Sequence, residues 1–119
     1  MYDISALYEA TSVQNAIELM QAHPEAALIA GGSDVLIKIR EGKLAGVELI
    51  SIFKLDELRG VSIDDDGALR ILPLTSFSHI TQHPLIQKYY PVLGEAVDQV
   101  GGPQLRNIGT IGGNICNGV

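Results

Sequence analysis

An apolar run passes directly into a glycine pair in the stretch Ala26-Ala27-Leu28-Ile29-Ala30-Gly31-Gly32-Ser33-Asp34. Because residues 26–30 are apolar at every position, they predict a strand that is buried on both faces, as in parallel sheets. The glycine pair then predicts a turn. Ser33 or Asp34 can cap a second helix, which we expect to run through residues 38–40 and to stop at Gly42.

The elements predicted on either side of this stretch alternate between helix and strand. Residues 2–5 form a short strand or lead-in, and Thr11 or Ser12 caps a helix that ends at His23-Pro24. Residues 47–52 form another buried strand. Strands that alternate with helices favour a parallel α/β arrangement.

The second half of the chain predicts shorter elements. We expect a helical turn at residues 55–58 and a hairpin of strands 61–63 and 69–72, joined by an acidic turn. Ser76 caps a helix, Pro84 and Pro91 open two more, and Gly101-Gly102 ends the last long helix. From residue 108 onward we expect an extended segment punctuated by glycine.

Composition narrows the class of protein. The chain has 119 residues, of which 46% are hydrophobic and 18% charged, so one domain or two small lobes can be packed. The net charge of -6 disfavours a nucleic-acid surface. A single cysteine excludes an internal disulfide and a cysteine-ligated zinc or iron–sulfur site. The N-terminus lacks a signal-peptide pattern and no apolar run approaches the ~20 residues of a membrane span, so we expect a cytoplasmic protein without a membrane partner.

A second glycine-rich stretch lies near the C-terminus, Gly101-Gly102-Pro103-Gln104-Leu105-Arg106-Asn107-Ile108-Gly109-Thr110-Ile111-Gly112-Gly113-Asn114-Ile115. Glycine gives up more chain entropy on folding than any other residue, so such a stretch needs a reason. Donor side chains flank the glycines: Arg106, Asn107, Thr110 and Asn114. Two such stretches, far apart in sequence, suggest one large anionic ligand held by main chain from two sides. The sequence contains neither a P-loop nor a Gly-x-Gly-x-x-Gly motif.

Both stretches resemble a known family. Residues 27–36 are similar to the first flavin-binding segment of the FAD-binding subunits of molybdenum hydroxylases, and residues 102–115 look like the second. The resemblance covers the whole chain. It is strongest to the FAD-binding subunits of bacterial xanthine dehydrogenases, and carbon monoxide dehydrogenase medium subunits are more distant relatives.

The resemblance implies a fold of the vanillyl-alcohol-oxidase type, which is α/β in its first lobe and α+β overall. Residues 1–54 would form a small N-terminal α/β lobe and residues 55–119 the beginning of a second, truncated lobe, with FAD between them. The chain is therefore expected to be a fragment. The implied FAD contacts come from two sets of residues: Ala27, Leu28, Ile29, Ala30, Gly31, Gly32, Ser33 and Asp34, and then Gly109, Thr110, Ile111, Gly112, Gly113 and Asn114.

The same resemblance implies a flavoprotein oxidoreductase subunit that does not act alone on the organic substrate. A partner with a molybdenum cofactor would oxidise the substrate, and an iron–sulfur partner would carry electrons one at a time. FAD would collect two electrons and pass them to NAD or another acceptor. No residue is predicted to be catalytic or to bind a metal: His23, His79 and His83 are interpreted as surface or capping groups, and Cys116 as a packing residue.

Two alternatives remain at this point. The chain could be a structural or interaction fragment without a ligand, in which glycines allow a tight bend or close packing. It could also be a nucleic-acid module, because residues 109–112 have the Gly-x-x-Gly spacing of a KH loop. The acidic balance and the few aromatic residues disfavour this second alternative.

Overall fold

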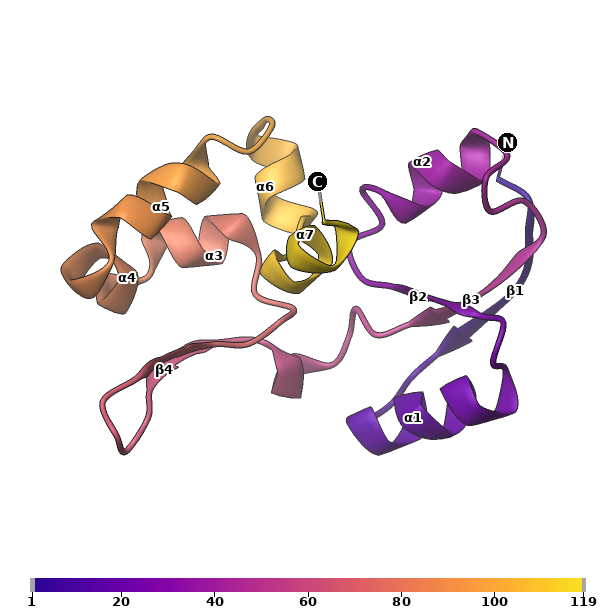
Figure 1. Ribbon diagram of the computed structural model, residues 1–119, viewed down its shortest axis with the longest axis horizontal. Helices are drawn as coiled ribbons and strands as arrows, with labels where there is room; N and C mark the ends of the chain where they lie inside the picture. The colour runs from indigo at the N-terminus through magenta and orange to yellow at the C-terminus, as the bar shows by residue number, and fades with distance from the viewer. Residues whose placement is uncertain (1, 119) are drawn as a thin grey trace. The chain divides into compact units, whose positions relative to one another are not determined.

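A computed structural model describes residues 2–118, which divide into two compact units with the boundary between Glu57 and Leu58. Figure 1 colours the chain from indigo at the N-terminus to yellow at the C-terminus.

The first unit is a parallel sheet with two helices. Its elements are β1 (Ile4–Glu9), α1 (Val13–Ala22), β2 (Ala27–Ile29), α2 (Val35–Arg40) and β3 (Val47–Ser51). The strand order is β1-β3-β2, and both pairings are parallel. Figure 1 shows α1 and α2 on opposite sides of the three strands. The parallel α/β arrangement predicted from the alternating elements is confirmed.

The central strand β3 carries the core of this unit. Leu49 and Ile50 are 1% and 0% exposed, and Ile39 of α2 and Ala16 of α1 are also buried. The prediction that residues 26–30 are buried on both faces was wrong, because Leu28 is 41% exposed. The physical reason is position: β2 is an edge strand that pairs only with β3, and an unbroken apolar run does not distinguish an edge from a centre.

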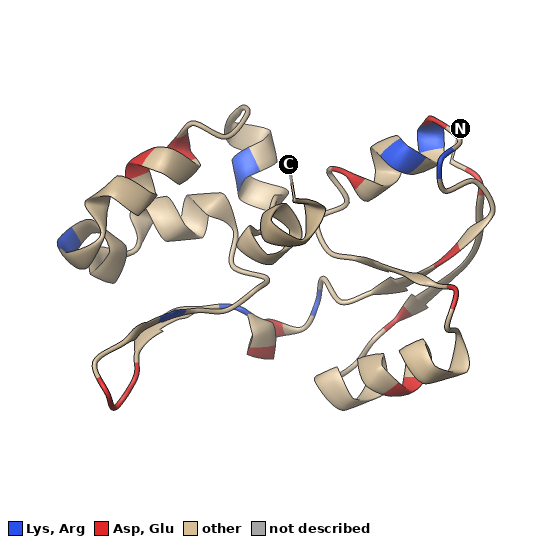
Figure 2. Cartoon of the chain, viewed as in Figure 1, with Lys and Arg blue, Asp and Glu red and all other residues tan. Residues whose placement is uncertain are grey.

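Helix α1 begins and ends where the sequence predicts. The Ser12 hydroxyl accepts a hydrogen bond from the Asn15 N–H at 2.9 Å, and the helix ends at His23, before Pro24. The predicted cap and stop of this helix are confirmed. Figure 2 shows basic residues on α2, whose last turn carries Lys38 and Arg40.

The second unit begins with an antiparallel hairpin. After a single 3-10 turn, η1 (Asp56–Leu58), strands β4 (Val61–Ile63) and β5 (Leu69–Ile71) pair as predicted. The Gly67 N–H bonds to the Asp64 carbonyl at 2.9 Å, and Gly67 has φ +83°, a conformation that favours glycine. The acidic run is therefore a hairpin turn.

Five helices follow the hairpin: α3 (Phe77–Gln82), α4 (Pro84–Tyr89), α5 (Pro91–Asp98), α6 (Pro103–Ile108) and α7 (Ile111–Asn117). Their core consists of Phe77, Ile80, Ile86 and Val97. Ser76 caps α3 through the His79 N–H, and Pro84 and Pro91 open α4 and α5, as predicted.

The expected extended segment after residue 108 was wrong. Residues 103–117 form two short helices, α6 and α7, separated by Gly109 and Thr110. The Thr110 hydroxyl caps α7 by accepting from the Gly113 N–H at 3.1 Å. A capping threonine and close packing against residues 73–77 outweigh the poor helix propensity of two glycines. Among residues 2–118 no helix is long and apolar enough to cross a membrane.

Candidate functional site

The first predicted segment, residues 27–34, lies at the carboxyl end of β2 and leads into α2. Gly32 has φ +78°, and its carbonyl accepts from the Leu36 N–H at 3.1 Å. A Cβ at Gly32 would also lie 3.2 Å from Leu36 Cδ1 and 3.3 Å from Ile29 Cδ1. The backbone conformation thus favours glycine here, whereas a Cβ would require only a small shift of the two side chains.

This loop presents a row of main-chain donors. Within residues 2–118, no protein acceptor bonds the N–H groups of Gly31, Gly32, Ser33, Asp34 or Val35. Asp34 occupies the cap position of α2 as predicted, but its side chain makes no capping bond. Successive free amides beside a positive-φ glycine are an arrangement that can bind an anion. The donor set therefore fits the diphosphate of a dinucleotide.

The second predicted segment, residues 109–114, uses its donors internally. The N–H groups of Ile111 and Gly112 bond to the carbonyls of Thr75 and Pro73 at 3.0 and 2.9 Å. The Gly113 N–H bonds to the Thr110 hydroxyl at 3.1 Å, and the Asn114 N–H to the Thr110 carbonyl at 3.1 Å. These four amides are committed to the fold, in contrast to those of residues 31–35.

Two glycines of the second segment serve close packing. A Cβ at Gly112 would lie 2.7 Å from the Pro73 carbonyl oxygen, and one at Gly109 would lie 3.0 Å from Phe77 Cε2. Gly113 and Asn114 are instead exposed. Close packing, the role that the ligand-free alternative gives to the glycines, thus accounts for Gly109 and Gly112. Gly113 and Asn114 form the exposed part of the segment.

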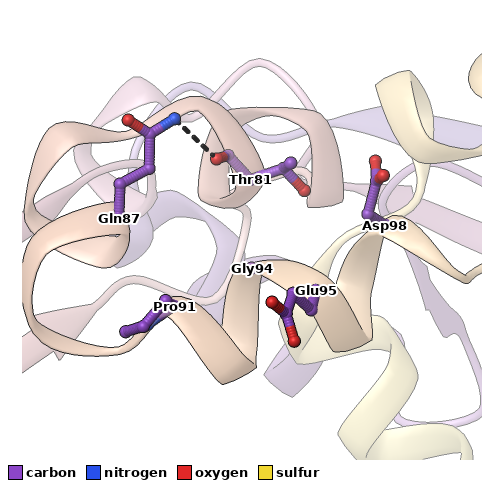
Figure 3. Close-up of a pocket in the computed structure, with 6 residues that line it drawn as sticks. All are labelled: Thr81, Gln87, Pro91, Gly94, Glu95 and Asp98. Carbon is purple, nitrogen blue, oxygen red and sulfur yellow. Dashed lines mark hydrogen bonds between the residues drawn. The ribbon is translucent and has the colours of Figure 1, made fainter.

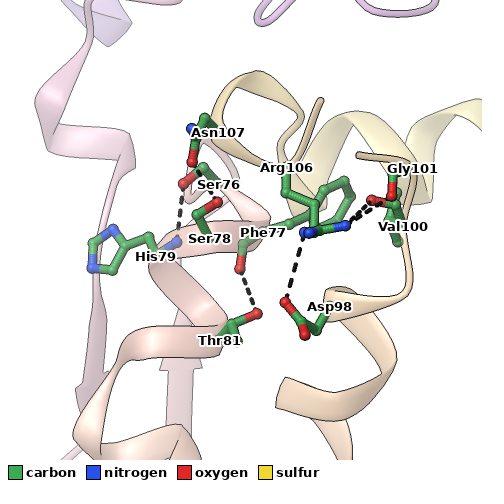
Figure 4. A network of polar contacts seen from close by, with 10 residues as sticks. All are labelled: Ser76, Phe77, Ser78, His79, Thr81, Asp98, Val100, Gly101, Arg106 and Asn107. Atoms are coloured by element: carbon green, nitrogen blue, oxygen red, sulfur yellow. Dashed lines mark hydrogen bonds and ion pairs between the residues drawn. The ribbon is translucent and has the colours of Figure 1, made fainter. Parts of the chain in front are cut away.

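The flanking donors Arg106 and Asn107 make polar contacts within the second unit (Figure 4). Arg106 Nη1 donates to the Gly101 and Val100 carbonyls at 2.8 and 3.3 Å, and its Nε lies 3.6 Å from Asp98. The Asn107 side-chain oxygen accepts from the Ser78 hydroxyl at 2.6 Å. The partner of Asn107 is distant in the sequence, whereas the partners of Arg106 lie in the turn between α5 and α6.

Two histidines, His83 and His23, contact neighbouring groups of the fold. His83 Nδ1 caps α4 by accepting from the Leu85 N–H at 3.2 Å, which confirms a capping group. His23 stacks on Tyr8 with centroids 4.2 Å apart and lies 3.3 Å from Glu48. The described residues contain no group of three side chains that could hold a metal ion.

Cys116 is exposed, so its interpretation as a packing residue was wrong. The residue lies on α7 instead of the expected strand, and the helix directs it outward.

An open hollow in the second unit is a separate feature. It is lined by Thr81, Gln87, Pro91, Gly94, Glu95 and Asp98 (Figure 3). Gln87 Nε2 donates to the Thr81 carbonyl at 3.3 Å across it. None of the predicted FAD contacts lies in this hollow.

Comparison with known proteins identifies the family of this chain. Residues 2–119 match the family described as the FAD binding domain in molybdopterin dehydrogenase. The chain belongs to this family, and FAD is the cofactor that the family binds.

Particular relatives agree with this assignment. The xanthine dehydrogenase FAD-binding subunit of Escherichia coli O157:H7 is 39% identical over 118 residues, covering 99% of this chain and 40% of the relative. The nicotinate dehydrogenase FAD-subunit of Eubacterium barkeri is 40% identical over 89 residues, covering 75% of this chain and 30% of the relative.

The solved structures agree with the fold. A carbon monoxide dehydrogenase from Hydrogenophaga pseudoflava matches with TM-score 0.92 and 31% identity, over 99% of this chain and 41% of that chain. The chain thus spans about 40% of the length of the E. coli relative. The fold class implied by the resemblance is confirmed.

Proposed function

We propose that this chain holds FAD within the FAD-binding subunit of a xanthine dehydrogenase-like molybdenum hydroxylase. The observation that carries the proposal is the row of five amides at residues 31–35, for which residues 2–118 supply no acceptor, beside a glycine with φ +78°. Two of these amides, those of Asp34 and Val35, would be free at any helix start, but those of residues 31–33 precede the helix and extend the row of donors.

The first segment supplies electrostatic binding. The amides of residues 31–35 would donate to the diphosphate oxygens, and the half-buried Ser33 adds a hydroxyl donor. Residues 27–30 place the loop at the end of β2. Bound FAD supplies the redox chemistry itself. This chain's residues bind and orient the cofactor, and none of them is assigned as an acid, base or nucleophile.

The second segment would contact FAD through its open part, Gly113 and Asn114, while Gly109, Thr110, Ile111 and Gly112 hold that part in place. Residues 1–54 and 55–119 would then be the two lobes that share the cofactor. The tight packing around Gly109 and Gly112 supports this role for Gly113 and Asn114, since it fixes the backbone that carries Asn114.

In the complete enzyme, we propose that FAD takes electrons from a partner iron–sulfur subunit, which receives them from a molybdenum-cofactor subunit that oxidises the substrate. NAD is the proposed acceptor, with another acceptor as the alternative. The names of the relatives as dehydrogenase subunits support this role. A location in the cytoplasm stays a prediction.

The test compares two variants that differ by one charge. Ser33→Asn and Ser33→Asp have side chains of the same shape, but only Asp adds a negative charge to the donor loop. A carboxylate about 6 Å from a phosphate costs roughly 1–3 kcal/mol at the effective dielectric of a protein surface. We expect Ser33→Asp to weaken FAD binding about ten- to hundredfold relative to Ser33→Asn, and the gap to shrink with added salt.

FAD binding is measured by titration of flavin fluorescence, with thermal unfolding of the FAD-free variants as the stability control. Equal FAD affinity of the two variants would show that residue 33 is not near the diphosphate. A wild-type chain that takes up no FAD would contradict the proposal as a whole.

A further inference from the structure

A single buried threonine connects the second glycine segment to the hairpin. Thr75 is 0% exposed. Its hydroxyl accepts from the Gly60 N–H at 3.0 Å and donates to the Gly60 carbonyl at 3.2 Å. Its main-chain carbonyl accepts from the Ile111 N–H at 3.0 Å. Thr75 therefore bonds on one side to the residue before β4 and on the other to the first residue of α7.

The contacts beside Thr75 repeat this arrangement. The Pro73 carbonyl accepts from the Gly112 N–H at 2.9 Å, and the Phe77 N–H donates to the Gly109 carbonyl at 3.2 Å. Ser76 and Thr110 form an isolated antiparallel bridge. Residues 73–77 are thus the base to which residues 109–112 are attached.

The base is itself attached to the hairpin. The Leu72 N–H bonds to the Gly60 carbonyl at 3.0 Å, and the Leu74 N–H to the Leu58 carbonyl at 2.8 Å. Gly60 has φ +141°, and its N–H finds its acceptor in the Thr75 hydroxyl. Without that hydroxyl, the Gly60 amide would lose its partner and the base would lose its only side-chain bond to Gly60.

We propose that Thr75 is a positioning residue for FAD: its hydroxyl fixes residues 73–75, and these fix the start of α7, which presents Gly113 and Asn114. The inference rests on the proposed function. Because Thr75 is fully buried, it would act on FAD through the main chain of residues 111 and 112.

Three variants separate this role from general stability. Thr75→Val keeps the shape of the side chain but removes the hydroxyl, and Thr75→Ser keeps the hydroxyl. Thr81→Val is the matched control, because the Thr81 hydroxyl bonds to the Phe77 carbonyl at 3.1 Å within its own helix and reaches no residue of the second segment.

We expect Thr75→Val to weaken FAD binding about tenfold, with Thr75→Ser within about twofold of wild type and Thr81→Val unchanged. A readout without FAD accompanies the titration: amide hydrogen exchange at Ile111 and Gly112 should speed up in Thr75→Val and not in Thr81→Val. If Thr75→Val fails to fold, Thr75→Cys replaces it, because a thiol is a weak hydrogen-bonding group.

Two results would overturn the inference alone. One is a Thr75→Val protein that binds FAD as Thr81→Val does, and the other is a Thr75→Ser protein as weakened as Thr75→Val, which would indicate methyl packing instead of hydroxyl bonding. A wild-type chain without FAD affinity would instead overturn the proposed function, and this inference with it.

Discussion

The two adjacent glycines of α7, Gly112 and Gly113, should differ in how much the same substitution destabilises the protein. A Cβ at Gly112 would lie 2.7 Å from the Pro73 carbonyl oxygen and 2.8 Å from Pro73 Cβ, distances that require the backbone to move. A Cβ at Gly113 would meet only the Thr110 hydroxyl oxygen, at 3.0 Å. Gly112→Ala and Gly113→Ala therefore form a matched pair: the same chemical change, in the same helix, at neighbouring positions.

The magnitude follows from opposing contributions. Alanine gains up to about 1 kcal/mol over glycine in a helix, at either position. At Gly112, overpacking costs about 1–3 kcal/mol, and displacement of the helix weakens the 2.9 Å bond from the Gly112 N–H to Pro73, which contributes about 1 kcal/mol. We expect Gly112→Ala to be destabilised by about 1–3 kcal/mol, and Gly113→Ala to lie within about 1 kcal/mol of wild type.

Thermal unfolding of the FAD-free chain, followed by circular dichroism, measures the difference. At roughly 4 °C per kcal/mol for a chain of this size, the Tm of Gly112→Ala should fall by about 4–12 °C. The reasoning would be refuted by a Gly112→Ala protein as stable as Gly113→Ala, because the contact with Pro73 would then not constrain α7. The comparison needs no cofactor, so it tests the packing independently of FAD.

Three further outcomes are expected. Ser12→Ala should lower the free energy of unfolding by about 1 kcal/mol in urea titrations, since the Asn15 N–H loses its acceptor at the start of α1. Arg106→Met should cost about 1–2 kcal/mol by the same measurement, because two main-chain carbonyls after α5 lose a charged donor; no change would mean that water replaces the guanidinium equally well. Desolvation, and then the charge and hydrogen bond of Glu48, raise the pKa of Tyr8 above its usual 10.0. The contribution of the neutral Tyr8 side chain to the free energy of unfolding should be fully present below pH 10.0 and lost as the pH rises through the higher folded-state pKa. Glu48→Gln should lower the pH at which Tyr8 ionises, measured as the difference in tyrosinate absorbance from Tyr8→Phe.

Local signals predicted much of the fold because they need only neighbouring residues. A serine hydroxyl reaches an amide three positions along, so the caps at Ser12 and Ser76 can be read from a few letters. Proline at a helix start and the acidic turn before Gly67 are equally local. The alternation of helices and strands around the first glycine pair predicted the parallel sheet.

The features that could not be predicted depend on how the elements are arranged in the folded chain. Residues 108–117 have the composition of a loop, yet they are helical in part because Gly112 bonds to Pro73, 39 positions earlier in the numbering. Leu28 is exposed because of its place in the strand order, which a single strand does not encode. Arg106 can donate to a ligand, but its guanidinium donates to the main-chain carbonyls of Val100 and Gly101. These carbonyls are available because α5 ends before them.

The two glycine segments, alike in sequence, differ in what their main chains have left to offer. The amides of residues 31–35 find no acceptor in the described part of the chain, whereas residues 111–114 have donated theirs within their own unit. An anion gains most from donors that no protein acceptor already satisfies, because a bonded amide must first give up its partner. Under the proposed function, the charged diphosphate therefore belongs to the first segment, and the second is suited to a less charged part of FAD, approached by a backbone held rigid before the cofactor binds.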